Sequence, residues 1–251
     1  LLDDYVRDAQ RITWIRRSFV KENIEKGFLP LYTHGFSDLD SQYCTVGICG
    51  VYEGAFFLGA GTDMKNPEIY VDFVENALNR INTLNLEASK EYGCHFNLEQ
   101  VPGENQAVNF AAKDRVQNLQ NEFRMYSNQW IPLTTQVDPF LRIHFSGKLD
   151  AKLSGGGILH ITTGSKVSAE VQKRLLFFAA KQGVVYFAFN YILSKCVCGE
   201  ITPSDIHACP KCGSSNIEHF TRVVGFLTPV KSWNAERRNE FHYRVRYDID
   251  A

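Results

Sequence analysis

Four cysteines gathered in one short segment constrain this chain more than any other feature of its sequence. They are Cys196, Cys198, Cys209 and Cys212, and a glycine follows both the second and the fourth. Two such pairs separated by a loop suit a structural zinc site, because four thiolates at about 2.3 Å surround the ion and leave no open position for catalysis. The first pair is irregular, with one intervening residue in place of two, so His207 is an alternative ligand to Cys196. A redox-active dithiol is a further chemistry open to this cluster.

The overall composition indicates an ordinary globular protein. A chain of 251 residues with 44% apolar content is long enough to bury the core of one large domain or one and a half. A net charge of -1 gives no field that would gather nucleic acid or an anionic membrane, so neither is an expected partner. No run approaches the roughly 18 apolar residues of a membrane span, and the start lacks the features of a signal peptide, so we expect a cytoplasmic protein. The absence of an initiator Met predicts a processed or truncated chain.

Two long segments carry apolar residues at helical spacing. The first runs over residues 5–24 and ends before Gly27, which suits a left-handed helix cap. The second opens with Asn66 as its predicted N-cap and ends near Gly93. Between them lies the glycine-rich stretch 44–54, which indicates backbone brought close to another part of the molecule. We therefore predict two long helices in the first hundred residues.

The middle of the chain alternates strands with helices. Residues 94–101 alternate like a half-buried strand and lead into a tight turn and a helix start. Residues 157–163 form a short β-rich run. Ser168 suits the cap of the next helix, and Gly183 precedes the apolar run 184–193. This order predicts a βαβ unit with two parallel strands and places the bulk of the chain in the α/β class, as an open sheet or part of a barrel.

The run Arg222-Val223-Val224-Gly225-Phe226 stands directly downstream of the cysteines, and a Trp-Asn pair and a charged stretch follow it. Taken alone, such a glycine is more often part of a loop or bulge. Together with the four cysteines, however, the run resembles the glycyl radical motif of the anaerobic (class III) ribonucleotide reductases, Arg-Val-x-Gly-[Phe/Tyr]. The resemblance implies that Gly225 carries the radical, at an α-carbon whose flanking amide nitrogen and carbonyl stabilise the unpaired electron.

Other parts of the chain resemble the C-terminal half of the same family. The matching segments, in order, are 29–36, 45–50, 98–104, 126–132 and 154–161. The resemblance therefore covers nearly the whole chain. It implies part of a ten-stranded α/β barrel of the glycyl radical enzyme type, with a small C-terminal zinc ribbon and glycyl radical loop. The implied units are 1–193 for the substrate-binding part of the barrel, 194–220 for the zinc knuckle and 221–251 for the glycyl radical loop and its tail.

The resemblance also implies an activity and its partners. The implied reaction is the anaerobic reduction of ribonucleotides, with triphosphates as the favoured substrates, to 2′-deoxyribonucleotides. A radical-SAM activase with a [4Fe-4S] cluster would make the Gly225 radical, which passes to a cysteine whose thiyl form abstracts the 3′ hydrogen of the ribose. Formate or a dithiol would supply the reducing equivalents, nucleotides would act as effectors, and the protein would form a homodimer. The reactive cysteine is expected in an N-terminal half that this chain lacks, and Cys49 is interpreted as a small buried thiol.

The turn at residues 102–105 has a physical interpretation of its own. A helix that starts directly after a strand presents free N–H groups and the positive end of its dipole to an anion. Reductases of the resembled family hold the nucleotide phosphates at such a helix start. The candidate substrate-binding residues are therefore Gly103, Glu104, Asn105 and Gln106. An ordinary capped helix is the alternative, and the glycine run 155–157 is either a second phosphate contact or a tight turn.

Two other functions fit parts of the sequence. A radical lyase of the pyruvate formate-lyase kind shares the glycyl chemistry, but such enzymes generally lack the zinc knuckle. A zinc-ribbon module that binds nucleic acid or protein without catalysis normally presents a basic face. In this knuckle two lysines stand against Glu200 and Asp205, so its charge is balanced. The reductase is therefore the favoured hypothesis.

Overall fold

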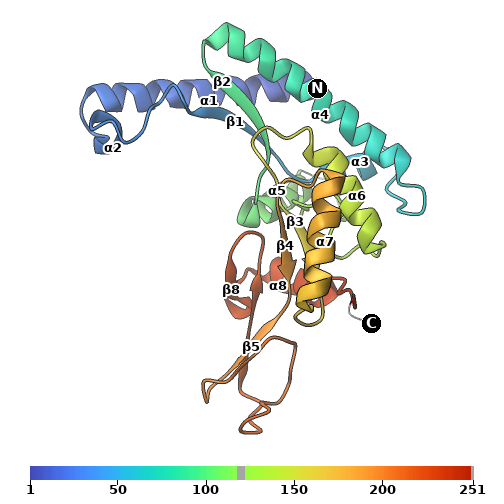
Figure 1. Ribbon diagram of the computed structural model, residues 1–251. Coiled ribbons are helices and arrows are strands. Elements are labelled where there is room, and N and C mark those ends of the chain that lie inside the picture. The colour runs from blue at the N-terminus through green and yellow to red at the C-terminus, as the bar shows by residue number, and fades with distance from the viewer. Residues whose placement is uncertain (118–121, 250–251) are drawn as a thin grey trace.

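Helices and short strands alternate through most of the protein, whose computed structural model describes residues 1–117 and 122–249 (Figure 1). The helices are α1 Leu2–Glu25, α2 Pro30–Thr33, α3 Val51–Phe57, α4 Glu68–Tyr92, α5 Glu104–Val116, α6 Pro139–Asp150, α7 Ala169–Gln182, the 3-10 turn η1 Val230–Ser232 and α8 Ala235–Tyr243. The strands are β1 Tyr43–Ile48, β2 His95–Gln100, β3 Leu159–Thr162, β4 Phe187–Asn190, β5 Leu193–Cys196, β6 Ile201–Thr202, β7 Ile217–Arg222 and β8 Leu227–Pro229. Within these residues, none of the helices combines the length and the apolar character that crossing a membrane requires.

Two pairs of parallel strands form the centre of the molecule. β1 and β2 pair and are connected through α3 and α4, whereas β3 and β4 pair and are connected through α7. The second pair is the predicted βαβ unit, which is confirmed. The Ser168 side chain accepts a hydrogen bond from the N–H of Val171 at the start of α7, and Gly183 ends the helix at a φ of 88°. Glycine adopts this left-handed conformation at no steric cost, which explains the sharp end of α7.

The glycine run 155–157 joins the two pairs. The N–H of Gly155 donates to the carbonyl of Leu98 at 2.7 Å, and the N–H of Gln100 donates to the carbonyl of Gly156 at 3.0 Å. A Cβ on Gly155 would lie 2.9 Å from the carbonyl oxygen of Leu98, so this close approach needs glycine. Backbone pairing with β2 therefore gives the run a structural reason, and a phosphate contact there stays a prediction.

Helices cover one face of these strands and form the core. The largest apolar cluster brings together α4, the β1–β2 pair and α6, and its fully buried members include Leu78, Leu98 and Leu149. A second cluster lies between α6, α7 and the β3–β4 pair and includes Ile161 and Leu175. Because side chains alternate along a strand, the side chains on the opposite face of β3 and β4 point away from these apolar clusters.

The first helix buries a narrow side that is part apolar and part polar. α1 packs on α4 and β1, and its two buried residues are Val6 and Gln10. The apolar side chains that made the helix predictable include Tyr5, Ile12 and Phe19, which are 68%, 65% and 62% exposed. The helix is therefore predicted correctly from the sequence, but most of its large apolar side chains face solvent in this chain.

The second long helix, α4, matches its prediction better at the end than at the start. It ends at Gly93, which has the expected left-handed conformation. At the start, Pro67 takes the cap position and no side chain caps the helix. Asn66, the predicted cap, lies instead in a turn in which its N–H donates to the carbonyl of Asp63 at 3.1 Å.

The C-terminal residues form an antiparallel sheet with the strand order β6-β5-β7-β8. This sheet projects at the end of the molecule opposite to α1 and α4 (Figure 1). The prediction of a mixed α/β fold is confirmed. The ten-stranded barrel stays a prediction, since the strands of the described residues lie in small sheets of two and four strands. The unit boundaries after residues 193 and 220 also stay predictions, and residues 250–251 of the predicted tail lie outside the described residues.

Candidate functional site

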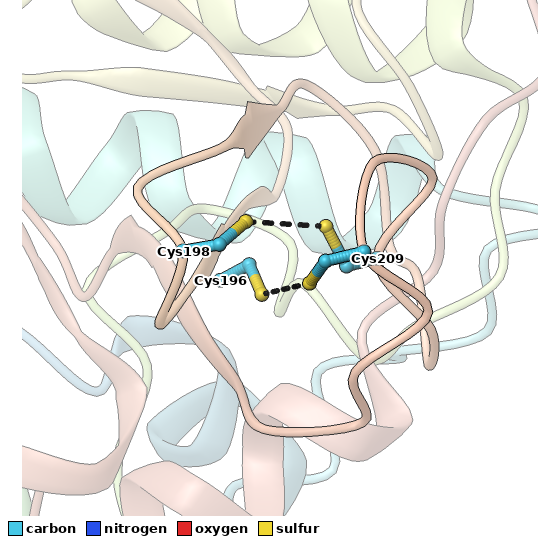
Figure 2. Close-up of side chains that lie close together, drawn as sticks. Cys196, Cys198 and Cys209 are labelled. Carbon is cyan, nitrogen blue, oxygen red and sulfur yellow. Dashed lines mark hydrogen bonds between the residues drawn. The ribbon is translucent and has the colours of Figure 1, made fainter.

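The four cysteine side chains converge between the end of β5 and the loop that precedes β7 (Figure 2). Their sulfur atoms all lie within 4.8 Å of one another. The Sγ atom of Cys196 is 3.6 Å from that of Cys212, and the Sγ atom of Cys198 is 3.7 Å from that of Cys209. A tetrahedral zinc ion with four sulfur ligands at about 2.3 Å requires sulfur–sulfur separations of about 3.8 Å, so the four thiolates fit such an ion. Among the described residues, Cys196 and not His207 completes the group.

Backbone N–H groups also point at these sulfur atoms. Burial raises the pKa of Cys209, but the N–H groups of Cys212 and Lys211 and the neighbouring thiols outweigh this effect and lower the pKa to about 7. Gly199 and Gly213 have positive φ values of 90° and 74°, as expected for the turns that aim backbone amides at sulfur. The neighbouring thiols raise the pKa of Cys212, so the geometry of the four sulfur atoms, and not their pKa values, supports a metal site. The cluster can therefore hold a metal ion such as zinc.

Gly225 lies in the hairpin that joins β7 to β8. The N–H of Val223 donates to the carbonyl of Phe226 at 3.1 Å and closes the turn. Gly225 is half-buried, its φ lies outside the left-handed region, and a Cβ built on it would meet no atom within 4 Å. Neither the backbone conformation nor the packing therefore requires glycine at this position.

Arginine side chains bind three carbonyl groups within residues 222–226, which we call the hairpin tip. The Nη1 atom of Arg222 donates to the carbonyl oxygen of Gly225 at 2.5 Å. The Nη1 and Nη2 atoms of Arg244 donate to the carbonyl oxygens of Arg222 and Val223 at 2.8 and 2.9 Å. Charge-assisted hydrogen bonds are stronger than neutral ones, so these contacts fix the path of the hairpin tip.

A buried cluster of charged side chains at α8 holds the side chain of Arg244 in place. The carboxylate of Glu240 accepts from Arg237 at 3.1 Å and from Arg244 at 3.2 Å. Burial acts in the other direction, but the two guanidinium groups outweigh it and lower the pKa of Glu240. The guanidinium of Arg244 also lies over the ring of Trp233, 5.2 Å from its centroid, which adds a cation–π contact. The charged cluster therefore orients Arg244, whose side chain binds carbonyl groups of the hairpin tip.

The hairpin tip begins against a polar face formed by β3 and β4. The Oδ1 atom of Asn190 accepts from the hydroxyl of Thr221 at 2.8 Å and from the N–H of Arg222 at 3.2 Å. His160 is 1% exposed, and its ring lies next to the backbone of Val224 in the hairpin tip. Burial, followed by the charges of Arg244 and Arg222, lowers the pKa of His160 to about 3. The ring is therefore neutral at physiological pH, and it sits among guanidinium groups without adding a charge.

Comparison with known proteins gives these features a common context. A family model described as anaerobic ribonucleoside-triphosphate reductase matches residues 1–247. The chain belongs to the anaerobic ribonucleoside-triphosphate reductase family. No match was found among the curated proteins.

Solved structures of anaerobic ribonucleotide reductases resemble this reductase-family chain closely. One, an anaerobic ribonucleotide reductase, is 38% identical over 98% of this chain, with a TM-score of 0.91. The anaerobic ribonucleotide reductase from Thermotoga maritima in complex with dATP and CTP is 39% identical over 95% of this chain, with a TM-score of 0.85. The same enzyme with glycerol in the active site is 38% identical over 95%, with a TM-score of 0.85. The matched regions are 41%, 40% and 39% of those chains, so this chain spans about two fifths of their length.

In this reductase-family chain, the predicted substrate-binding residues lie together at the start of α5. They are Gly103, Glu104, Asn105 and Gln106, and no side chain caps the helix there. The side chain of Asn105 accepts a hydrogen bond from that of Asn234 at 3.1 Å. Asn234 is the N-cap of α8, so the helix start contacts the segment that follows Gly225. The structure thus brings the predicted substrate-binding residues near the C-terminal tail, while their contact with phosphate stays a prediction.

The sequence motifs of the reductase family do not single out the residues that support the hairpin tip, which are Asn190, Arg237, Glu240 and Arg244. A weak signal exists for three of them. Glu240 is three residues after Arg237 and four before Arg244, the spacings at which opposite charges pair on a helix. Nothing in that spacing indicates burial, however, because exposed helix faces carry the same pattern.

The sequence also gives no role to Glu53, a buried acid in this reductase-family chain. It lines a cavity of about 440 Å³ between α3, residues 123–135 and α8. One carboxylate oxygen accepts from the N–H of Ser127 at 2.9 Å, and the other has no partner among the described residues. Burial raises the pKa of Glu53 to about 7. A single glutamate in a glycine-rich stretch looks like a surface residue, which is why the sequence does not reveal it.

Proposed function

We propose that this chain is the part of an anaerobic (class III) ribonucleotide reductase that stores the radical and helps to hold the substrate. The reaction is the reduction of ribonucleotides, with triphosphates as the favoured substrates, to 2′-deoxyribonucleotides. Membership of the family supports this reaction class. Because the chain spans 41% of a solved relative, the complete reaction is proposed for the whole protein.

One observation carries the assignment of the radical to Gly225. This glycine stands in the family motif, yet neither its backbone conformation nor its surroundings require it. A radical at its α-carbon would be stabilised by the amide nitrogen and the carbonyl on either side. A side chain would twist this system and shield the α-hydrogen. The absence of a side chain is therefore the property on which the chemistry depends.

The proposed radical transfer balances one hydrogen atom at each step. A radical-SAM activase with a [4Fe-4S] cluster removes a hydrogen atom, one proton with one electron, from the α-carbon of Gly225. A cysteine S–H then returns a hydrogen atom to Gly225 and becomes a thiyl radical, which takes the 3′ hydrogen of the ribose. The two electrons that remove the 2′ hydroxyl as water come from formate or from a dithiol. The activase, the reductant and the homodimer rest on the family resemblance alone.

We assign a structural Zn²⁺ to Cys196, Cys198, Cys209 and Cys212. The sulfur separations and the backbone N–H groups aimed at sulfur support this assignment. When bound, the ion would link the end of β5 to the loop before β7 and leave no ligand position for substrate. Its role would be to hold the sheet that carries the hairpin tip.

The nucleotide phosphates are assigned to the start of α5. The helix offers N–H groups without a side-chain cap at Glu104, Asn105 and Gln106, and an anion there is favoured by the helix dipole. Nucleotides as substrates and effectors are supported by solved relatives, one described with dATP and CTP and another with dATP in the specificity site. The contact between Asn105 and Asn234 supports a substrate position close to the segment that carries Gly225.

Anaerobic activation tests the radical assignment directly. The whole protein is incubated with its radical-SAM activase, SAM and a reductant, and the EPR spectrum is recorded. We expect a doublet from one α-hydrogen, lost in Gly225→Ala, and cleavage of the chain at Gly225 when air is admitted. A doublet that survives in Gly225→Ala would show that the radical lies elsewhere.

Product analysis then separates this reductase from the alternatives. The activated protein is given CTP with formate or with a dithiol, and dCTP is measured. Formation of dCTP supports the reductase, whereas a doublet without any deoxyribonucleotide would favour a radical lyase. No doublet under any condition, with zinc still bound, would favour a zinc-ribbon module without catalysis.

A further inference from the structure

Arg222 makes a contact that its place in the sequence motif does not explain. It is the last residue of β7, and its Nη1 atom donates to the carbonyl oxygen of Gly225 at 2.5 Å. This carbonyl is one of the two groups that would share the unpaired electron of a Gly225 radical. The arginine therefore binds the part of the glycine whose electronic state changes when the radical forms.

Arg222 is itself held firmly on both sides of its α-carbon. Its N–H donates to the Oδ1 atom of Asn190 at 3.2 Å, and its carbonyl accepts from Arg244 at 2.8 Å. The side chain then has to turn back over only three residues to reach Gly225. The backbone of Arg222 is thus held in place, and its half-buried side chain starts next to the carbonyl that it binds.

The two arginines at the hairpin tip divide the carbonyl groups between them. Arg244 binds the carbonyl oxygens of Arg222 and Val223, which lie before the glycine. Arg222 binds the carbonyl oxygen of Gly225 itself. Both contacts order the loop, but only the second touches the peptide group that is conjugated with the α-carbon. The two side chains therefore offer a matched comparison between ordering the loop and acting on the radical.

A positive donor on this oxygen has a definite electronic effect. In a glycyl radical the amide nitrogen donates electron density and the carbonyl accepts it, so part of the spin moves from the α-carbon to the carbonyl oxygen. A guanidinium that donates to that oxygen stabilises the accepting form, because charge-assisted hydrogen bonds are strong and the tip is half-buried. Spin density at the α-carbon falls as a result.

We propose that Arg222 is a positioning residue that holds and polarises the Gly225 carbonyl, and so stabilises the radical stored on that glycine. This inference rests on the proposed function, since it requires a radical at Gly225. The simpler alternative is that Arg222 only closes the turn between β7 and β8. The alternatives differ in what they predict for the radical's spectrum, because a contact that only orders the loop leaves the spin distribution unchanged.

The test compares Arg222→Gln, Arg222→Lys and Arg244→Gln in the whole protein, each activated anaerobically with the activase. The splitting of the EPR doublet reports the spin density at the α-carbon. We expect a wider splitting in Arg222→Gln, a splitting near that of the wild type in Arg222→Lys, which keeps a positive donor, and no change of splitting in Arg244→Gln. An unchanged splitting in Arg222→Gln would overturn the proposal, as would an equal widening in both glutamine variants.

If a variant gives no measurable doublet, its splitting is unknown, and the variants are compared by whether they retain or lose the radical. Loss of the radical in Arg222→Gln, with retention in Arg222→Lys and in Arg244→Gln, supports the proposal. Loss in both glutamine variants overturns it, because disorder of the loop then explains the result. A wild-type protein that never shows a doublet is a different outcome, since it contradicts the proposed function and not the role of Arg222 within it.

Discussion

At the scale of single residues, the glycines of this chain differ in what a side chain would meet. A Cβ on Gly147 would lie 1.9 Å from the carbonyl oxygen of Gln182, whereas one on Gly225 would meet nothing within 4 Å. We therefore expect Gly147→Ala to lower the free energy of unfolding by about 1–3 kcal/mol. Gly225→Ala should change it by less than about 1 kcal/mol. Urea unfolding of the two variants provides the measurement, and an equal loss in both would remove the structural support for a chemical role of Gly225.

A second residue, Glu53, should make stability depend on pH. Burial raises its pKa from 4.5 to about 7, so the folded protein keeps a proton that the unfolded chain releases between these values. The contribution of Glu53 to stability is therefore complete below pH 4.5 and is lost as the pH rises through 7. The integrated effect is on the order of 3 kcal/mol.

Glu53→Gln isolates this effect, because glutamine does not titrate. We expect the variant to gain stability relative to the wild type as the pH is raised from 5 to 8. The measurement is the free energy of urea unfolding of both proteins at several pH values. A difference between the two proteins that stays constant across this range would contradict the raised pKa.

The residues that could be predicted are those whose chemistry depends on local spacing. The four cysteines belong to this group, because their ligand spacing lies within a short stretch of sequence and the structure brings them together. The role of Gly225 comes from the motif that adjoins them and stays a prediction. The supporting residues could not be predicted. Asn190 binds a strand end 32 residues later, and Arg244 binds carbonyl groups 22 and 21 residues earlier. Such partners are brought together only by the fold.

At the scale of elements, α1 shows what a periodic pattern reveals and what it does not. The spacing of apolar residues predicts a helix, and a helix is found. The same spacing does not reveal which side is buried. The inner side is held by the buried Val6 and by the hydrogen bond from Gln10 to Asn85 at 2.8 Å, while most of the large apolar side chains are exposed. Periodicity fixes the conformation of a segment, but its neighbours decide its orientation.

This orientation leads to a prediction for two substitutions on α1. Val6 is 5% exposed and Phe19 is 62% exposed. We expect Val6→Ala to lower the free energy of unfolding of this chain by about 1–2 kcal/mol, because it removes buried methyl groups. Phe19→Ser should change it by less than about 0.5 kcal/mol, because it removes little buried area. Thermal and urea unfolding measure both, and a larger loss for Phe19→Ser than for Val6→Ala would reverse the assignment of the buried side.

At the scale of the whole molecule, sequence patterns do not reveal the contacts between residues that are far apart in the chain. The βαβ unit is predictable because its strands and helix follow one another directly. The join between β2 and the glycine run 155–157 depends on hydrogen bonds between residues far apart in the chain, such as Gln100 and Gly156. The contact between Asn105 and Asn234 spans 129 residues. No local pattern indicates either one, so the relation between the helix start and the C-terminal tail becomes visible only in the structure.

The same scale governs how a metal ion bound to the four cysteines would act on the hairpin tip. β7 connects the two features, because Ile217 pairs with Cys196 at one end and Arg222 begins the hairpin tip at the other. At about 3.3 Å per residue, the strand carries the effect of the cysteine cluster over about 17 Å. A bound ion stabilises the sheet that it crosslinks, and the sheet in turn limits the motion of the hairpin tip.

Removing the metal should therefore loosen the loop without unfolding the centre of the molecule. In Cys212→Ser we expect loss of stoichiometric zinc, faster hydrogen exchange in residues 217–227, and unchanged exchange in the βαβ unit at residues 159–190, which has its own core. Cys49→Ser is the matched control, because it removes a thiol outside the cluster and should change neither zinc content nor exchange in residues 217–227. Hydrogen exchange with mass spectrometry and metal analysis test both variants. Equal exchange in residues 217–227 with and without zinc would mean that the ion does not support the loop, whereas faster exchange throughout residues 159–190 would mean that it supports the whole fold.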